Sequence, residues 1–72
     1  MEQKLRHRIA LNMKIERVKN GFTQEKLAEL VEVSTKHITK IENAKVTPSI
    51  FLIYKIAEAL NVSIDTLTKR EI

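Results

Sequence analysis

Residues 23–45 read TQEKLAELVEVSTKHITKIENAK, and this stretch decides the fold. It predicts two short helices, residues 24–31 and residues 35–43, separated by a bend. Thr23 and Ser34 stand immediately before them. A hydroxyl at that position accepts a hydrogen bond from a free backbone N–H of the first helical turn. The stretch is therefore predicted to be a pair of capped helices joined by a turn of a few residues.

The bend around residues 31–34 contains no glycine, although a tight reversal favours a residue that adopts positive φ without strain. The single glycine of the chain, Gly21, lies upstream. We expect positive φ at Glu32, with its side chain in solvent. The second helix should end through positive φ at Ala44, or at Asn43, which tolerates this region better.

Signals for other helices lie on both sides of this stretch. They are Gly21 at the end of a helix over residues 4–20, Thr47 and Pro48 at the start of a fourth helix that Asn61 ends, and Ser63 before a short last helix. Proline is favoured at the first helical position because the N–H it lacks would have no partner there. We expect a frayed tail over residues 69–72.

Each predicted helix carries one apolar stripe that must be buried against the others. In chain order, the stripes are Leu5, Ile9 and Met13; Leu27, Ala28, Leu30 and Val31; Val33, Ile38 and Ile41; Ile50, Ile53, Ile56, Ala57 and Leu60; and Ile64 with Leu67. No strand-like alternation competes with this pattern. The sequence therefore predicts an all-α fold, a single compact five-helix domain over residues 1–72.

The composition narrows the class of protein. The chain has 72 residues, of which 43% are hydrophobic and 31% charged, a balance typical of one globular domain. It has no cysteine and only two, widely separated, histidines, so we expect neither disulfides nor a metal site. No apolar run is long enough to span a bilayer, and charges interrupt the N-terminal segment too often for a signal peptide. We expect a cytoplasmic protein without membrane contact, cofactor or small-molecule ligand.

The charge is distributed unevenly along the chain. The formal net charge is +4, and the excess of Lys and Arg lies in residues 1–22, with six against two Glu, and in residues 34–45, with three against one. Basic segments of this kind favour an anionic partner. Nothing resembles a Ser, His and Asp set, a carboxylate pair or a glycine-rich phosphate loop, so we do not expect an enzyme.

The second helix of the bend carries an outward row of hydrogen-bonding and cationic side chains: Thr35, Lys36, Thr39, Lys40 and Asn43. A helix of about ten residues fits the major groove of B-DNA, where such side chains reach the base edges. The other interpretation of such a row is a solvated helix face. The arrangement of two short helices, with the second one exposing this row, is that of a helix-turn-helix, here residues 23–43.

The stretch TQEKLAELVEVSTKHITKIENAKVTPS, continued by IYKIAEALNVSIDTL, resembles the phage-repressor family of helix-turn-helix proteins, also called the Cro/C1, XRE or lambda-repressor-like type. The resemblance runs without a break in register over residues 9–68. It implies a DNA-binding transcriptional regulator with a recognition helix over residues 35–43.

The resemblance also assigns roles to individual residues. It implies that Thr35, Lys36, Thr39 and Lys40 read bases, that Gln24, Asn43 and Lys45 contact the DNA backbone, and that Arg17 and Glu42 form a structural pair. Gln24 is also implied to brace the recognition helix. His37 lies beside the reading face, as either a further phosphate contact or a solvated side chain.

The first helix departs from the family pattern. Leu11, Ile15 and Val18 form a second apolar stripe at positions that the family usually leaves polar, and Glu16 replaces a usual core leucine. Either the tail around Ile72 or a partner protein is expected to cover this stripe. Exposure of the stripe in the isolated domain would favour the partner.

We expect a sequence-specific regulator of double-stranded DNA, a repressor that acts as a homodimer on a roughly palindromic operator. One short helix supplies few base contacts, so two domains are needed for useful specificity. The family often dimerises through its last two helices, which makes Ile64 and Thr66 candidates. The rival interpretation is a protein-interaction module on the same fold, antitoxin-like or anti-repressor-like, and the second stripe favours it.

Overall fold

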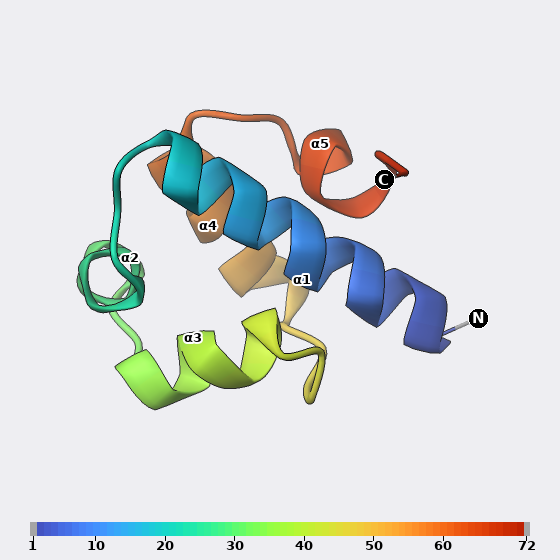
Figure 1. Ribbon diagram of the computed structural model, residues 1–72, viewed down its shortest axis with the longest axis horizontal. Coiled ribbons are helices and arrows are strands. Elements are labelled where there is room, and N and C mark those ends of the chain that lie inside the picture. The colour runs from blue at the N-terminus through green and yellow to red at the C-terminus, as the bar shows by residue number, and fades with distance from the viewer. Residues whose placement is uncertain (1, 72) are drawn as a thin grey trace.

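The computed structural model describes residues 2–71. Over this range the chain forms α1 (Glu2–Lys19), α2 (Gln24–Val31), α3 (Thr35–Glu42), α4 (Ile50–Leu60) and α5 (Ile64–Thr68), and no strand. The long helix α1 crosses the domain, with α3 on one side and α5 on the other, while α2 packs against α3 and α4 (Figure 1). None of the described helices is long and apolar enough to cross a membrane.

Hydroxyl caps begin all four helices after α1. Thr23, Ser34, Ser49 and Ser63 each accept a hydrogen bond from the backbone N–H three residues further on, at 3.0–3.2 Å. These bonds satisfy donors of the first turn that have no partner inside the helix. The predicted caps at Thr23, Ser34 and Ser63 are confirmed.

The predicted start of the fourth helix at Thr47 and Pro48 is wrong. The helix begins at Ile50, after the cap Ser49. The Thr47 hydroxyl instead accepts a hydrogen bond from Arg6 Nε at 3.1 Å, and Pro48 is buried in the connecting loop. Two nearby start signals compete here: the Ser49 hydroxyl provides the cap, and the Thr47 hydroxyl contacts α1.

The turns contain the left-handed residues that the sequence predicts. The φ angle is 61° at Glu32 and 58° at Ala44, whereas Asn43 remains at −92°. At the end of α2 the Val33 N–H reaches back to the Ala28 carbonyl at 3.0 Å. At the end of α3 the Lys45 N–H does the same with the Lys40 carbonyl at 2.9 Å. Both helices thus close with the hydrogen-bond pattern that ordinarily uses glycine, without having one.

One hydrophobic core lies between the helices. Its buried members are Ile9, Met13, Leu27, Ala28, Val31, Ile38, Ile41, Leu52, Ile53, Ile56, Ala57, Leu60 and Leu67, with Val33 and Ile64 partly buried against it. Three predicted core residues are exposed instead, namely Leu5, Leu30 and Ile50. Leu30 and Ile50 lie roughly a quarter of a turn from the centre of the buried face of their helices, and Leu5 lies near the start of α1. Leu52 of α4, which was not among the predicted core residues, is buried.

A buried polar cluster ties the C-terminal segment to α1, so the predicted frayed tail is wrong as far as Arg70. Arg70 donates from Nε to Asn12 Oδ1 and from Nη1 to Glu16 Oε2, both at 2.9 Å. Asn12 Nδ2 in turn donates to the carbonyls of Leu67 and Arg70. Asn12 and Glu16 are almost fully buried. The glutamate that replaces a usual core leucine is therefore neutralised in place by an arginine from the other end of the chain.

The second apolar stripe of α1 is largely uncovered. Leu11 and Val18 are 46% and 60% exposed, and Ile15 is half-buried. The described part of the tail leaves these side chains in solvent, and Ile72, which was expected to cover them, lies outside the described residues. The first helix thus has an outer face that the rest of residues 2–71 does not bury.

Candidate nucleic-acid interface

Helix α3 presents the predicted reading face to solvent. Ile38 and Ile41 are fully buried and fix the rotation of the helix, which leaves Thr35, Lys36 and Lys40 exposed on the other side. Within residues 2–71, neither of these two lysines has a carboxylate within ion-pair distance. Their ammonium groups are therefore available to an anionic or hydrogen-bond-accepting ligand.

A buried hydrogen-bond chain holds α3 against α1 and α2. Arg17 donates from Nε and Nη2 to the two carboxylate oxygens of Glu42, at 2.7 and 3.1 Å, and from Nη1 to the Phe22 carbonyl at 2.7 Å. Gln24 Nε2 donates to Glu42 Oε1 at 3.0 Å, and Gln24 Oε1 accepts from the Thr39 hydroxyl at 2.8 Å. We call Arg17, Glu42, Gln24 and Thr39 the brace.

The Arg17–Glu42 pair of the brace is bidentate and almost fully shielded from solvent. The side chains of Arg17 and Glu42 are only 11% and 2% exposed, so the charge-assisted bonds between them act in a medium of low dielectric. The brace connects three helices at the end of α1, the start of α2 and the last turn of α3. It therefore fixes the angle at which α3 leaves the domain, as a helix must be fixed before it can read a groove.

The brace also limits what two predicted site residues can do. The Thr39 hydroxyl lies 2.8 Å from Gln24 Oε1 and 3.1 Å from the Thr35 carbonyl, so its proton is engaged within the domain, and its methyl group and an oxygen lone pair remain for a ligand. Gln24 uses one amide N–H on Glu42, so its second N–H remains for a phosphate at the start of α2. Sequence reasoning did not identify Thr39 as a member of the brace, because nothing in its spacing distinguishes an outward threonine from one turned toward α2.

The remaining predicted phosphate contacts lie around the ends of α3. Asn43 and Lys45 are exposed in the turn that follows the helix, and His37 is half-buried in its first turn. Lys45, like the two lysines of the reading face, has no ion pair within the described chain. Gln24, at the start of α2, is next to Thr39 and accepts a hydrogen bond from its hydroxyl. The predicted site residues are thus gathered along α3 and at its flanks.

A cleft joins this region to α1, and sequence reasoning missed it. The cleft has a volume of about 230 Å³ and is lined by His7, Ala10, Leu11, Lys14, Glu42, Asn43 and Ala44. The signal that points to it is the recurrence of basic residues on α1 at helical spacing.

Residues 13–67 match the family described as Helix-turn-helix. The chain belongs to the Cro/C1-type helix-turn-helix family. The match begins within α1 and ends within α5, so it contains the brace, the reading face and both turns with left-handed residues.

Individual proteins support the same assignment. An uncharacterized HTH-type transcriptional regulator of Archaeoglobus fulgidus is 45% identical over 51 residues, which is 71% of this chain and 73% of that protein. Among solved structures, a hypothetical transcription factor NHTF from Neisseria superimposes with a TM-score of 0.87 at 32% identity, over 94% of this chain and 78% of that one. The clp gene regulator ClgR from Corynebacterium glutamicum gives a TM-score of 0.83 at 28% identity, over 88% and 68%. This Cro/C1-type domain is therefore a transcriptional regulator with a DNA-binding helix-turn-helix fold.

Proposed function

We propose that the domain binds double-stranded DNA sequence-specifically by inserting α3 into the major groove. The observation that carries this proposal is the combination of an unpaired cationic row on α3 with a buried brace that fixes the helix. A solvated helix face needs neither a fixed angle nor lysines free of carboxylates. A helix that reads base edges needs both.

The side chains divide into readers and anchors. Lys36 and Lys40 are suited to donate to guanine O6 and N7, and the methyl groups of Thr35 and Thr39 to contact thymine methyls. Gln24, Asn43, Lys45 and His37 are placed at the flanks, where the backbone of a groove-bound duplex passes. Contacts to phosphate set the register of the domain on the duplex but do not read sequence.

We further propose that the domain acts as a homodimer on a roughly palindromic operator and represses by occluding that site. The α3 helix has only eight residues, so a single domain offers few base contacts. Large apolar side chains for a partner copy are present on α4, where Phe51 and Tyr54 are 70% and 51% exposed. Ile64 and Thr66 of α5 are half-buried, so they contribute less free surface than α4.

A comparison of two lysine substitutions tests the division into readers and anchors. Lys40→Ala should relax discrimination at one position of the preferred site, by roughly 1–3 kcal/mol. Lys45→Ala should weaken binding to all sequences about equally. The measurement is the affinity of each variant for a panel of duplexes with single base changes. A uniform loss for Lys40→Ala would contradict its role as a reader.

The protein-interaction module remains the second candidate, and exposed Leu11 and Val18 favour it. A salt series separates the two functions. Duplex binding should weaken with log[salt] at a slope of about −0.9 for each phosphate neutralised. A pure protein binder should show no duplex affinity to titrate.

A further inference from the structure

The outer face of α1 carries its basic residues in one line. Positions 4, 7, 11, 14 and 18 recur at intervals of three and four, so on a helix with 3.6 residues per turn they lie within an arc of about 80°. Their residues are Lys4, His7, Leu11, Lys14 and Val18, and all five are exposed. We call this set the α1 face. It contains three basic side chains and no carboxylate.

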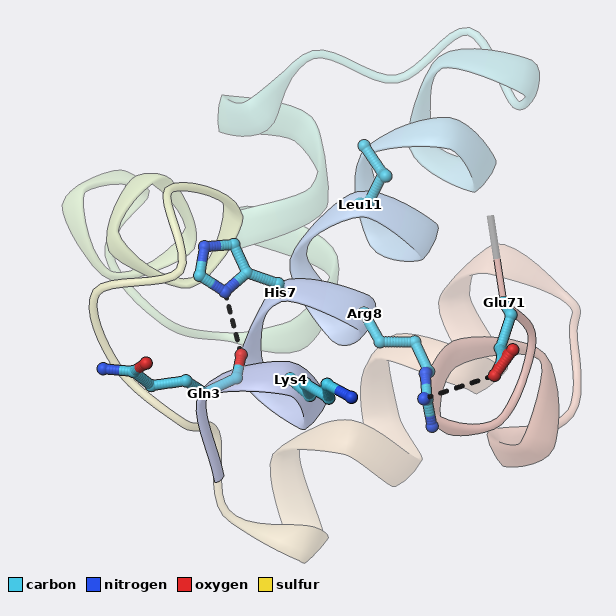
Figure 2. A pocket seen from close by; sticks show the side chains of 6 residues that line it. All are labelled: Gln3, Lys4, His7, Arg8, Leu11 and Glu71. Carbon is cyan, nitrogen blue, oxygen red and sulfur yellow. Dashed lines mark hydrogen bonds and ion pairs between the residues drawn. The ribbon is translucent and has the colours of Figure 1, made fainter. Parts of the chain in front are cut away.

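Two adjoining clefts connect the α1 face to the candidate DNA interface. His7 and Leu11 line both clefts. The first, of about 480 Å³, also includes Lys4, and the second also includes Lys14, Asn43 and Ala44. Figure 2 shows the His7 ring directed toward the loop after α3, while Arg8 points away from it toward Glu71. The α1 face therefore continues the surface that ends at Asn43.

The loop after α3 is also fastened to the first turns of α1. Arg6 Nε donates to the Thr47 hydroxyl at 3.1 Å, which ties the turn containing His7 to the loop that carries Lys45. Lys4 and Lys14 are ten residues apart, so they are separated by about 15 Å along the helix axis. That distance corresponds to about four nucleotides along the axis of one DNA strand. The surface is long enough to follow a strand beyond the groove that α3 would occupy.

We propose that the α1 face binds the phosphate backbone of duplex DNA that flanks the site read by α3. This inference rests on the proposed function and extends its footprint to residues ahead of the family match, which begins at residue 13. Lys4 and Lys14 supply the charge. His7 Nδ1 lies 2.8 Å from the Gln3 carbonyl, which only accepts, so the proton is on Nδ1. The two lysines, whose ammonium groups are donors only, carry the contact to phosphate.

The chemistry of the face favours a nucleic acid over a protein. Leu11 is the apolar residue between the two lysines, and it is flanked on both sides by basic side chains. Two carboxylates line the adjoining clefts. Glu42 is nearly fully buried and already bound by Arg17 and Gln24, and the exposed Glu71 lies 3.8 Å from Arg8 Nη2, so both negative charges have a cationic partner. A row of cations continuous with predicted phosphate anchors complements a polyanion.

The test measures binding of the full chain to two duplexes as a function of salt. The short duplex covers only the selected site, and the long duplex carries about five more base pairs at each end. Lys4→Gln/Lys14→Gln should reduce the salt slope by about 1.8 for each bound domain, or about 3.6 for the proposed homodimer, because each domain loses two phosphate contacts. The wild type should bind the extended duplex more tightly than the short one, and the double variant should lose that gain. The ratio of the affinities for the selected and the shuffled duplex should be the same in the double variant as in the wild type.

Lys69→Gln is the matched control, because Lys69 is an exposed lysine on the C-terminal side that pairs with Asp65. It should leave both the slope and the gain from the longer duplex unchanged. An unchanged slope in the double variant, with a wild type that binds DNA, would overturn the inference and leave the proposed function standing. A wild-type chain that binds no duplex would remove the proposed function itself.

Discussion

Ala44 holds a backbone conformation that a Cβ atom disfavours. Its φ of 58° places it in the left-handed region, at a cost of roughly 1 kcal/mol relative to an unstrained residue. The conformation persists because the Lys45 N–H must reach the Lys40 carbonyl to close α3, and the buried Ile38 and Ile41 hold the helix in place. The strain is compensated by packing elsewhere in the domain.

Ala44→Gly should therefore stabilise the domain. The expected gain is about 0.5–1 kcal/mol, since glycine removes the left-handed strain but has more conformational entropy in the unfolded chain. Urea denaturation measures the change. Glu58→Gly, on the exposed face of α4, is the control and should cost about 1 kcal/mol. A loss of stability for Ala44→Gly would show that Ala44 is not strained.

The buried Arg17–Glu42 pair of the brace should contribute strongly to stability. Arg17→Met leaves the buried Glu42 carboxylate with Gln24 as its one remaining donor among residues 2–71, so the free energy of unfolding should fall by about 3 kcal/mol. The double variant Arg17→Met/Glu42→Leu should recover much of that loss, because no unpaired charge is left in the interior. Chemical denaturation of the two variants measures both steps. Equal destabilisation by the single and double variants would contradict the account.

At the scale of the helices, the sequence predicted the helix ends and turns that depend on residues close together in the chain. The hydroxyl caps, the left-handed Glu32 and the end of α1 at Gly21 follow from local backbone chemistry, and the structure contains all of them. The start of α4 was mispredicted because Thr47 and Ser49 offer equal local signals. Ser49 caps the helix, whereas Thr47 binds Arg6, a residue 41 positions away that local signals do not reveal.

The cluster of Asn12, Glu16 and Arg70 could not be predicted for the same reason. Its partners are 54 to 58 positions apart in the chain, and no periodicity indicates where a C-terminal segment will pack. From the sequence alone, Asn12 and Glu16 are two polar residues on the buried side of α1 with no evident partner. Only the position of Arg70 provides donors for the Asn12 and Glu16 side-chain oxygens.

Arg70→Met should destabilise the domain by about 2 kcal/mol. The loss is smaller than for the brace because the Arg70 side chain is 37% exposed and Lys19 Nζ remains 3.7 Å from Glu16. Adding Glu16→Leu should restore stability to near the native level, since it replaces the carboxylate with an apolar core residue. Lys69→Met, which breaks an exposed ion pair, serves as the control and should change stability by less than about 0.5 kcal/mol. Failure of Glu16→Leu to rescue Arg70→Met would contradict the role of the cluster.

At the scale of the whole molecule, the basic segments of the sequence become one side of the structure. The cations of residues 34–45 line α3 and its exit turn. Of the basic residues of α1, His7 and Lys14 line the cleft that adjoins this turn, whereas Arg8 and Lys19 pair with Glu71 and Glu16. The resemblance in residues 9–68 predicted α3 and three members of the brace, Arg17, Gln24 and Glu42, but not Thr39. It did not locate the α1 face, because Lys4 and His7 precede the stretch that carries the resemblance.

The account as a whole depends on whether α3 reads DNA sequence. Selection of bound duplexes from a random pool, followed by affinity measurement at fixed salt, tests this directly. The account predicts one enriched motif with two inverted half-sites about one helical turn apart. The selected site should bind at least about 10³-fold more tightly than a shuffled duplex, and Lys36→Ala/Lys40→Ala should abolish that preference while retaining non-specific binding. A pool without an enriched motif, or equal affinity for selected and shuffled duplexes, would contradict it.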